Sequence, residues 1–280
     1  MSNADQEEFW STVAGRSWVA LQLEMDAMLQ PVLDLVLHRA ALPAGARVLD
    51  IGCGTGASVL QAAEHVGPQG HVTGLDISQT MLDLARSRLK DHPNTECLKA
   101  DAQVHAFEAH DYDALISRFG VMFFDDTTAA FSNISRALAP GASLTFAAWG
   151  PAPQNPYFMQ PAKIASEVLG PMDKMDRTLP GPFAFEDHVR IIPMLQAAGL
   201  QDVLVDPVSL HLTPPGTVQE TAEKMCQIGP AERTLTHYEA TDADRARLVA
   251  ALADWLTRCE TDRGIEVPAL INLYQAKAPG

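Results

Sequence analysis

The sequence lacks any apolar run of the length that crosses a membrane, and its first eight residues are acidic and polar, without the cationic and apolar parts of a secretory leader. Cysteine is scarce as well. The four thiols are far apart in the sequence and show neither a metal-ligand spacing nor a disulfide framework: Cys53, Cys97, Cys226 and Cys259. We therefore expect a cytoplasmic protein without a metal site.

Basic residues are few. The chain has 20 Lys and Arg against 35 Asp and Glu, a formal net charge of −15. Such a surface repels phosphate backbones and anionic lipid head groups, so we expect neither a nucleic acid nor a membrane as partner. A surplus of acid also serves plain solubility, and for this reason the charge excludes partners without identifying one.

Apolar residues are plentiful. They make up 47% of the 280 positions, enough for one catalytic domain with an inserted or appended cap. From residue 47 to 149 short β-rich runs alternate with helical patterns, which is typical of βαβ units and a parallel sheet covered on both faces. The predicted strands are 46–51, 71–76, 95–100, 112–117 and 142–148, and the helices are 57–66, a segment capped by Ser78, and 127–139. The pattern predicts an α/β protein with a doubly wound, mostly parallel sheet.

The flanks predict further helices. Residues 9–41 indicate one or two helices, and we take 1–41 as an N-terminal helical cap on a main domain at 42–280. In that domain, insertions at about 150–185 and 213–262 are expected to form a lid. The first insertion is rich in proline and glycine and predicts irregular structure. The remaining predictions are helices at 186–199, shortened or kinked at Pro193, at 217–229 and at 242–262, and strands at 202–212 and 266–276.

A glycine-rich loop follows the first predicted strand and opens a helix. It reads Asp50-Ile51-Gly52-Cys53-Gly54-Thr55-Gly56, and its backbone can approach a ligand where a Cβ would intrude. Asp76 ends the second strand, where a carboxylate can accept hydrogen bonds from two ribose hydroxyls. Because the loop also satisfies the looser dinucleotide fingerprint, a nicotinamide-dependent oxidoreductase stays an alternative.

Three features favour a single adenosine over a dinucleotide. Asp50 places a carboxylate in the loop, where it would repel a pyrophosphate. Asp101 and Ala102 end the third strand, where a carboxylate and a backbone amide can meet the adenine nitrogens. The sequence also lacks the Tyr-x-x-x-Lys pair of short-chain dehydrogenases. A cofactor-binding regulatory module that has lost catalysis remains a second alternative.

With these motifs the chain resembles the class I S-adenosylmethionine-dependent methyltransferases, in the ubiquinone/menaquinone-biosynthesis C-methyltransferase (methyltransferase type 11) group. The resemblance is strong over about 45–150 and loose in the flanks. It rests on Val48 to Gly56, Gly74 to Ser78, Asp101-Ala102, Phe119 to Phe124, Arg136 to Gly141 and Ala198 to Leu200. One departure is Ala142, where the family more often has a second glycine. The resemblance implies a Rossmann-like, seven-stranded sheet with S-adenosyl-L-methionine as cofactor.

The same resemblance implies a role for each motif residue. The glycines would pass under the methionine moiety, Asp50 would engage its amino-acid end or steady the loop, and Asp76 would hold the ribose. Asp101 with Ala102 would hold the adenine, and two apolar side chains would line its face. The predicted cofactor-binding residues are Asp50, Gly52, Gly54, Gly56, Asp76, Ile77, Met81, Asp101, Ala102 and Ser117.

The acceptor is expected beyond the carboxyl ends of the fourth and fifth strands, the usual crevice of an open α/β sheet. Its candidate residues are Trp18, Ser117, Phe119 and Trp149, with Arg118 nearby. An activated methyl needs a dedicated base only if the acceptor must lose a proton, and the nine histidines offer no clear one. His105 reads as a surface residue, whereas His211 and His237 could face the acceptor. We predict methyl transfer by in-line displacement to a small, partly apolar metabolite, with acceptor atom, base and homo-oligomeric state left open.

Overall fold

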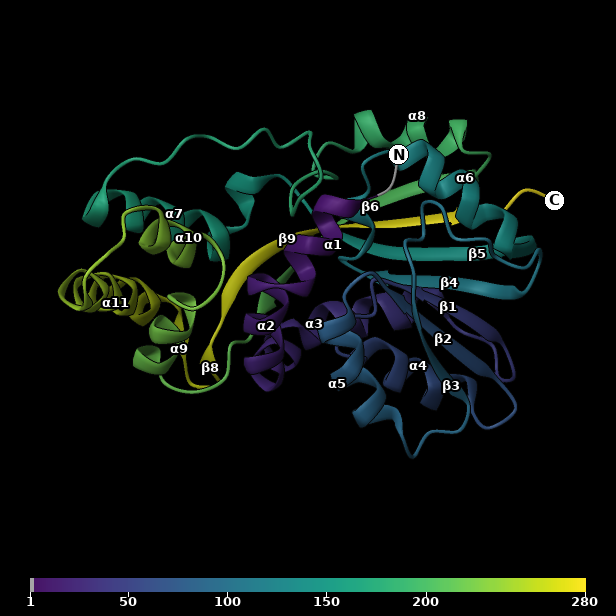
Figure 1. Ribbon diagram of the computed structural model, residues 1–280, viewed down its shortest axis with the longest axis horizontal. Helices are drawn as coiled ribbons and strands as arrows, with labels where there is room; N and C mark the ends of the chain where they lie inside the picture. Colours follow the sequence, from purple (N-terminus) through teal and green to yellow (C-terminus); the bar gives the residue numbers. More distant parts are fainter. Residues whose placement is uncertain (1–2) are drawn as a thin grey trace.

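The computed structural model describes residues 3–280, apart from the side chain of Val13. Its centre is a seven-stranded sheet in the order β3-β2-β1-β4-β5-β9-β6, in which only β9 runs antiparallel to its neighbours (Figure 1). The strands are β1 Arg47–Ile51, β2 His71–Asp76, β3 Thr95–Lys99, β4 Tyr112–Arg118, β5 Leu138–Trp149, β6 Gln201–Leu212 and β9 Val267–Lys277. The predicted doubly wound, mostly parallel sheet is confirmed.

The predicted strand positions are also confirmed, with one extension. β5 begins at Leu138, four residues before its predicted start, because Leu138 pairs with Tyr112 across a shift in register. The order of the strands reverses between β1 and β4, which pair in parallel from Val48 and Ala114 onward. The connections that follow β1 and β4 run in opposite directions, and this leaves a crevice at the carboxyl ends of the two strands. The glycine loop lies at this crevice.

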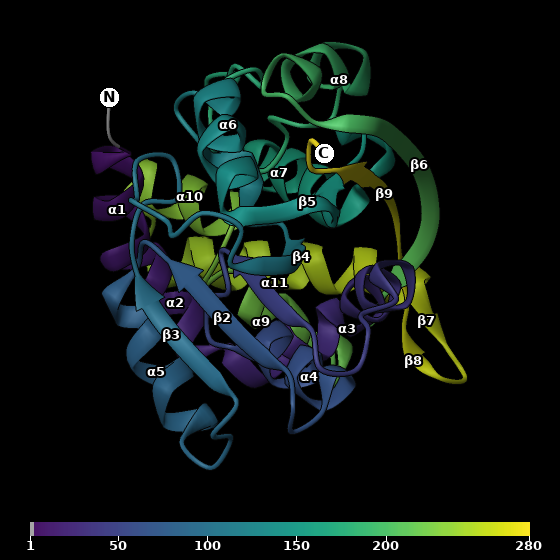
Figure 2. The same ribbon diagram turned by 90° about the vertical axis from the view of Figure 1, so that its right-hand side faces the viewer.

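Helices cover both faces of the sheet (Figures 1 and 2). One face carries α3 Gln22–Ala40, α4 Ala57–Val66 and α5 Gln79–Leu89, and the other carries α6 Thr127–Ala137 and α8 His188–Ala197. Ser78 caps α5 as predicted, since its Oγ accepts the N–H of Met81 at 3.2 Å. Pro193 lies inside α8, which Asp187 caps through the N–H groups of Val189 and Arg190.

The N-terminal segment differs from its prediction. It forms three helices, α1 Ala4–Ser11, α2 Val13–Ala20 and α3, so the expectation of one or two was wrong. Thr12 and Leu21 have non-helical backbone angles and separate the three. α3 packs against β4, β5 and β6 and forms part of the sheet's covering layer, whereas α1 and α2 lie beside α5. The part of the segment that can act as a cap is therefore α1 and α2.

Four helices cluster at one end of the molecule, where Figure 1 shows them apart from the sheet: α7 Pro156–Leu169, α9 Val218–Met225, α10 Pro230–His237 and α11 Asp242–Leu256. The prediction of irregular structure over 150–185 was wrong for α7, which continues through Pro161. Packing of α7 against α10 and α11 outweighs the cost of that proline. α10 was not predicted either, although Pro230 stands at the first helical position, where proline is favoured.

The remaining elements are short. They are the ribbon of β7 Glu260–Thr261 with β8 Gly264–Ile265, and three single 3₁₀ turns at Val121–Phe123, Ala152–Gln154 and Thr257–Cys259. Within residues 3–280 no helix combines the length and the apolar character needed to cross a membrane.

Candidate functional site

The glycine loop holds its shape through contacts with two neighbouring strands. The N–H groups of Gly52 and Cys53 both donate to the carbonyl of Leu75, at 2.8 and 3.1 Å. Gly52 has a φ of +70°, and a Cβ there would lie 2.4 Å from the Cα of Gly120, in the turn after β4. Glycine at position 52 is therefore required by the close approach of two backbone segments, in addition to any ligand.

The other two loop glycines face α5. Gly56 begins α4 with a φ of +88°, and a Cβ on it would meet the Cβ of Ala85 at 3.2 Å. A Cβ on Gly54, which has a φ of +55°, would meet only the flexible end of Met81, at 3.1 Å. Gly54 is thus the loop position with the most room above its backbone. Met81 is buried and Ile77 is half-buried, and their predicted role at the adenine face stays a prediction.

Asp76 lies at the end of β2 with both carboxylate oxygens engaged by backbone. Oδ2 accepts the N–H of Gly54 and Oδ1 accepts that of Ser78, each at 2.8 Å. Burial raises the pKa of this carboxyl, while the backbone hydrogen bonds from Ser78, Gly54 and Ile77 oppose that rise. With three backbone donors the carboxylate still has one lone pair free, so a ribose hydroxyl can bind. Asp76 therefore joins the glycine loop to the start of α5.

Asp101 is held by the N-terminal segment of the chain. The backbone N–H of Asn3 donates to its Oδ2 at 3.0 Å, and the Asn3 amide donates to its Oδ1 at 2.7 Å. Oδ1 also accepts the N–H of Gln103 at 2.9 Å. The neighbouring Ala102 is buried, and its carbonyl accepts from Asn133. Asn3 was not predicted to lie here, because the contact joins residues 98 positions apart.

Asp50 is fully buried at the end of β1. Its Oδ2 accepts the hydroxyl of Ser58 in α4, but its Oδ1 has no partner among residues 3–280. Burial raises the pKa of Asp50 to about 7, against the hydrogen bond from Ser58 and the charge of Arg118. One oxygen thus steadies the loop and the helix after it. The other oxygen is a buried hydrogen-bond acceptor without a donor among residues 3–280.

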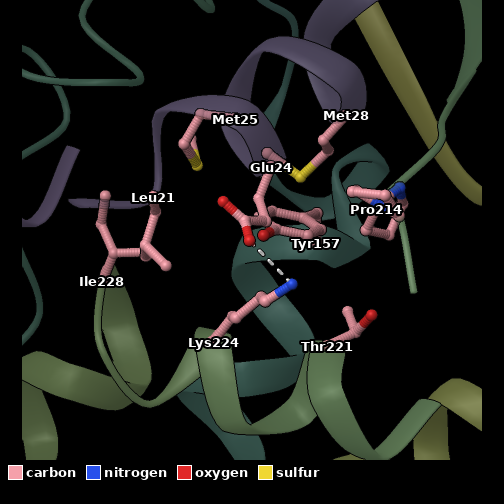
Figure 3. A pocket seen from close by; sticks show the side chains of 10 residues that line it. Leu21, Glu24, Met25, Met28, Tyr157, Pro214, Thr221, Lys224 and Ile228 are labelled. Carbon is pink, nitrogen blue, oxygen red and sulfur yellow. Dashed lines mark ion pairs between the residues drawn. The ribbon is translucent and has the colours of Figure 1, made fainter. Parts of the chain in front are cut away.

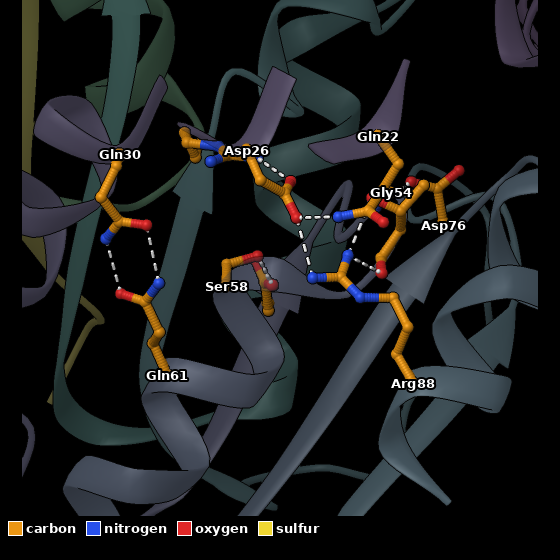
Figure 4. A network of polar contacts seen from close by, with 11 residues as sticks. Gln22, Asp26, Gln30, Gly54, Ser58, Gln61, Asp76 and Arg88 are labelled. Carbon is orange, nitrogen blue, oxygen red and sulfur yellow. Dashed lines mark hydrogen bonds and ion pairs between the residues drawn. The ribbon is translucent and has the colours of Figure 1, made fainter. Parts of the chain in front are cut away.

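Near Asp50, the carboxylate of Asp26 on α3 lies close to two arginines, Arg88 and Arg118. Asp26 binds Arg88 at 2.8 Å and the Gln22 amide at 2.5 Å, both through Oδ2, as Figure 4 shows. Arg118, at the carboxyl end of β4, lies 3.9 Å from Asp26 Oδ1, and burial lowers its pKa. Asp26 was not predicted, because the sequence of α3 does not distinguish it from the other charged residues of that helix, Glu24, Asp34 and Arg39.

Two of the four candidate acceptor-site residues, Ser117 and Trp149, make contacts that hold the fold together. Ser117 is fully buried; its hydroxyl donates to the carbonyl of Ile51 at 2.6 Å and accepts the N–H of Gly120 at 3.1 Å. It joins β1 to the turn after β4 and has no hydroxyl hydrogen left for an acceptor. Trp149 is 5% exposed and lies between Phe119, which stacks on it, and Phe158. These contacts favour packing over a contact with the acceptor.

The other two aromatic candidates differ in position. Trp18 on α2 is half-buried and contacts the edge of Trp10, which in turn contacts Phe123. This cluster fixes the N-terminal helices to the turn after β4. Phe119 is 8% exposed and has a φ of +68°, a conformation that a bulky side chain rarely adopts and that often occurs at functional sites.

The three histidines considered as catalytic bases, His105, His211 and His237, do not form one site. His211 and His237 are exposed, on β6 and at the end of α10, and the expectation that they could face the acceptor stays a prediction. His105 is half-buried against the edge of Phe107. No catalytic base can therefore be named from these three residues.

A small pocket lies between α3, α9 and α7 (Figure 3). Its cavity volume is about 20 Å³, room for about one water molecule. The walls are largely apolar, and an ion pair between Glu24 and Lys224 at 3.0 Å crosses it. Two hydroxyls belong to the lining: the phenol of Tyr157, whose pKa is raised by burial, and Thr221, whose buried hydroxyl has no partner within residues 3–280.

The strand ends offer the groups that S-adenosylmethionine requires. Asp76 and Asp101 lie at neighbouring strand ends, as a ribose and an adenine demand, and Gly54 leaves room above the loop. Asp50 keeps a buried oxygen without a partner, which suits an ammonium group and not a pyrophosphate. The residues present fit this cofactor.

Comparison with known proteins decides the class. Residues 48–141 match a family model described as a methyltransferase domain. This stretch is a methyltransferase domain. The demethylmenaquinone methyltransferase of Staphylococcus saprophyticus is 26% identical over 179 residues, which cover 61% of this chain and 76% of that protein. The domain is of the class I S-adenosylmethionine-dependent kind, close to the quinone methyltransferases.

Two further matches show how much of the chain is similar to known proteins. The aklanonic acid methyltransferase DauC of Streptomyces sp. strain C5 is 36% identical over 104 residues, 36% of this chain and 47% of that protein. The match thus spans just under half of that relative. A phosphoethanolamine N-methyltransferase 2 of Haemonchus contortus, solved with S-adenosyl-L-methionine, has a TM-score of 0.53 at 22% identity, over 89% of this chain and 53% of that one. This likeness supports the fold around the methyltransferase domain.

Proposed function

We propose that the protein transfers a methyl group from S-adenosylmethionine to a small, partly apolar metabolite by in-line displacement. The observation that carries the choice of acceptor is the pocket between α3, α9 and α7, where apolar walls surround two hydroxyls and one ion pair. The lining, though not the cavity volume of about 20 Å³, agrees with small-molecule sites, which are mostly apolar with a few polar groups that fix orientation. The relatives act on aklanonic acid and demethylmenaquinone by name, which agrees with such an acceptor.

For the cofactor, the proposal assigns one part of the site to each part of the molecule. Asp76 binds the ribose, Asp101 with Ala102 binds the adenine, and the loop of Gly52, Gly54 and Gly56 carries the methionine chain. Bound there, S-adenosylmethionine supplies a sulfonium methyl that is already activated. The protein's task is then to align the acceptor with the carbon–sulfur bond and to exclude water.

For the acceptor, the proposal assigns the pocket of α3, α9 and α7 as the entry and holding site. Like any tyrosine, Tyr157 is neutral near pH 7 and can donate a hydrogen bond to a polar atom of the acceptor, and burial, which raises its pKa further, favours this neutral form. An acceptor larger than one water must open this pocket. Movement of α9 away from α3, with breakage of the Glu24–Lys224 pair, would open it.

The proposal also covers the protein's partners, its location and the lid over the crevice. The net charge of −15 opposes binding of nucleic acid. All four cysteines are free thiols, which supports the cytoplasm as the place of action. The lid would consist of α7 with α9, α10 and α11, and of α1 and α2 on the other side of the crevice. Whether two chains associate is tested directly by light scattering of the purified protein.

An acceptor screen tests the proposal. The protein is incubated with S-adenosylmethionine and with aromatic or polyketide-like metabolites that carry hydroxyl, amino or acidic carbon groups, and release of S-adenosylhomocysteine is measured. We expect release with at least one partly apolar acceptor and none with RNA or DNA. Tight binding of S-adenosylhomocysteine without turnover for any acceptor would favour the regulatory module. Tight binding of a nicotinamide dinucleotide in its place would contradict the proposal.

A further inference from the structure

Three buried polar atoms without partners lie around the carboxyl ends of β1 and β4. Among residues 3–280, Asp50 Oδ1, Asp26 Oδ1 and Arg118 Nη1 make no hydrogen bond. Buried polar groups of folded proteins nearly always have partners, and each one left without a partner costs about 1–3 kcal/mol. The three groups come from different elements, β1, α3 and β4, so a local turn does not explain their arrangement.

The same side chains also act on one another through their charges. Asp26 uses Oδ2 for Arg88 and Gln22, while Oδ1 lies 3.9 Å from Arg118 Nη2, too far for a hydrogen bond. The positive charge of Arg118 also acts on Asp50. Two carboxyl groups and one cationic donor, each with a buried atom that makes no hydrogen bond among residues 3–280, thus lie near one another beside the glycine loop.

This set of groups complements an α-amino acid, which carries one carboxylate and one ammonium. We infer that Arg118 binds the carboxylate of the cofactor's methionine end and that Asp26 and Asp50 flank its ammonium. The inference rests on the proposed use of S-adenosylmethionine. It assigns to α3, through Asp26, a direct part in cofactor binding, and Arg88 and Gln22 then act as positioning residues that hold Asp26.

A pair of ligands separates this role from a structural one. S-adenosylhomocysteine carries the amino-acid end, and 5′-methylthioadenosine has the same nucleoside and sulfur without it. For Arg118→Met we expect affinity for S-adenosylhomocysteine to fall about 10- to 100-fold, as for loss of a charge-assisted hydrogen bond, while affinity for methylthioadenosine changes less than about twofold. Both affinities are measured by calorimetric titration. Arg39→Met, at an exposed ion pair with Asp206, serves as the matched control.

Two further variants, Arg118→Lys and Asp26→Asn, test the inference independently. Arg118→Lys should recover part of the lost affinity, and Asp26→Asn should show the same selective loss even if Arg118→Met does not fold. An equal loss for both ligands, or no loss, would make Arg118 and Asp26 a structural pair that fixes α3 to the sheet. If the unchanged protein binds neither ligand, the proposed cofactor itself fails, and the two failures are thereby distinct.

A different observation carries a second inference, at Asp101. Asn3 is 6% exposed; its amide N–H donates to Asp101, and its amide oxygen accepts the N–H of Asp125 at 2.7 Å. A donor and an acceptor side by side are also what the Watson–Crick edge of adenine presents, through its amino group and ring nitrogen. We infer that Asn3 occupies the adenine contacts of Asp101 and must leave before the cofactor binds.

Contacts along α1 fasten this segment, so its release is a defined step. Ser78 and Thr80 donate to the carbonyls of Trp10 and Ser11, and Lys99 pairs with Glu7 at 2.7 Å. For Asn3→Ala we expect affinity for S-adenosylhomocysteine to rise about threefold to tenfold, because a competing ligand for Asp101 is removed. Glu7→Ala leaves Asn3 in place and should change it little. Unchanged or weaker binding in Asn3→Ala would show that Asn3 is a wall of the site and not a competitor.

Discussion

Phe119 lies flat against Trp149, with ring centroids 4.1 Å apart and planes only 8° from parallel. Trp149 then meets the edge of Phe158, whose chain neighbour Tyr157 lines the pocket beside α3. A continuous series of rings thus runs from the carboxyl end of β4 to the proposed acceptor pocket. The left-handed backbone of Phe119 aims its ring at Trp149, so the strained residue is the first member of the series.

Removal of the indole should mainly damage the fold. Trp149→Ala leaves a cavity between Phe119 and Phe158, and we expect it to lower the free energy of unfolding by about 3–5 kcal/mol, with a fall in turnover that follows from misalignment. Trp149→Phe keeps the stack and should lose under half of that. Chemical denaturation and turnover are measured on both. A Trp149→Ala protein of unchanged stability and lost turnover would instead make Trp149 an acceptor contact.

Loss of the Asp76 carboxylate should weaken cofactor binding. Asp76→Ala removes charge-assisted hydrogen bonds to the ribose, worth roughly 1.5–3 kcal/mol, and frees the N–H groups of Gly54 and Ser78. We expect affinity for S-adenosylhomocysteine to fall by about 10- to 100-fold in calorimetric titration. Asp83→Ala, at an exposed carboxylate of α5, should leave the affinity unchanged. Equal behaviour of the two variants would mean that the ribose lies elsewhere.

Asp50 should make the ligand-free protein less stable as pH rises toward neutral. Its pKa is 3.8 unfolded and about 7 folded, so over this window the folded state keeps a proton that the unfolded state has lost. Stability therefore falls from about pH 4 to pH 7 and levels off above. Asp50→Asn keeps the acceptor for Ser58 and should lack this slope. Urea unfolding of both proteins across that range measures it, and a rise in the wild type relative to the variant would show an ionised Asp50 paired with Arg118.

Much of the fold followed from local patterns. β1, β2 and α4 end where alternation, the glycine loop and the Gly67 turn predict, because those signals depend on a few adjacent residues. Asp76 was identifiable for the same reason, since it stands at a fixed distance after the loop. The positions of the loop and of Asp76, which we propose to bind the cofactor, could therefore be predicted from the sequence.

The rest depends on contacts between distant segments. Asp26 approaches Arg118 only because α3 packs across β4, and Asn3 meets Asp101 over 98 positions. The pocket needs Tyr157 from α7, a helix that its prolines argued against. No periodicity within one segment predicts contacts between distant segments, so the residues of the proposed acceptor pocket could not be predicted from the sequence.

Two buried threonines on neighbouring helices test the pocket by contrast. Thr221 on α9 lines the pocket with its hydroxyl unpartnered among residues 3–280, whereas Thr234 on α10 donates its own to the carbonyl of Pro230 at 2.9 Å. Valine has the same shape as threonine without the polar atom. Thr221→Val should therefore raise the free energy of unfolding by about 1 kcal/mol, and Thr234→Val should lower it by a similar amount.

The two variants should also differ in catalysis. If the hydroxyl of Thr221 binds the acceptor, Thr221→Val raises the KM for that acceptor about tenfold while affinity for S-adenosylhomocysteine stays unchanged, because one hydrogen bond of roughly 1.4 kcal/mol is lost. Thr234→Val should leave the KM as it is. Denaturation curves and initial rates with the acceptor found by the screen provide both readouts. A stabilised Thr221→Val enzyme with an unaltered KM would place the acceptor outside the pocket of α3, α9 and α7.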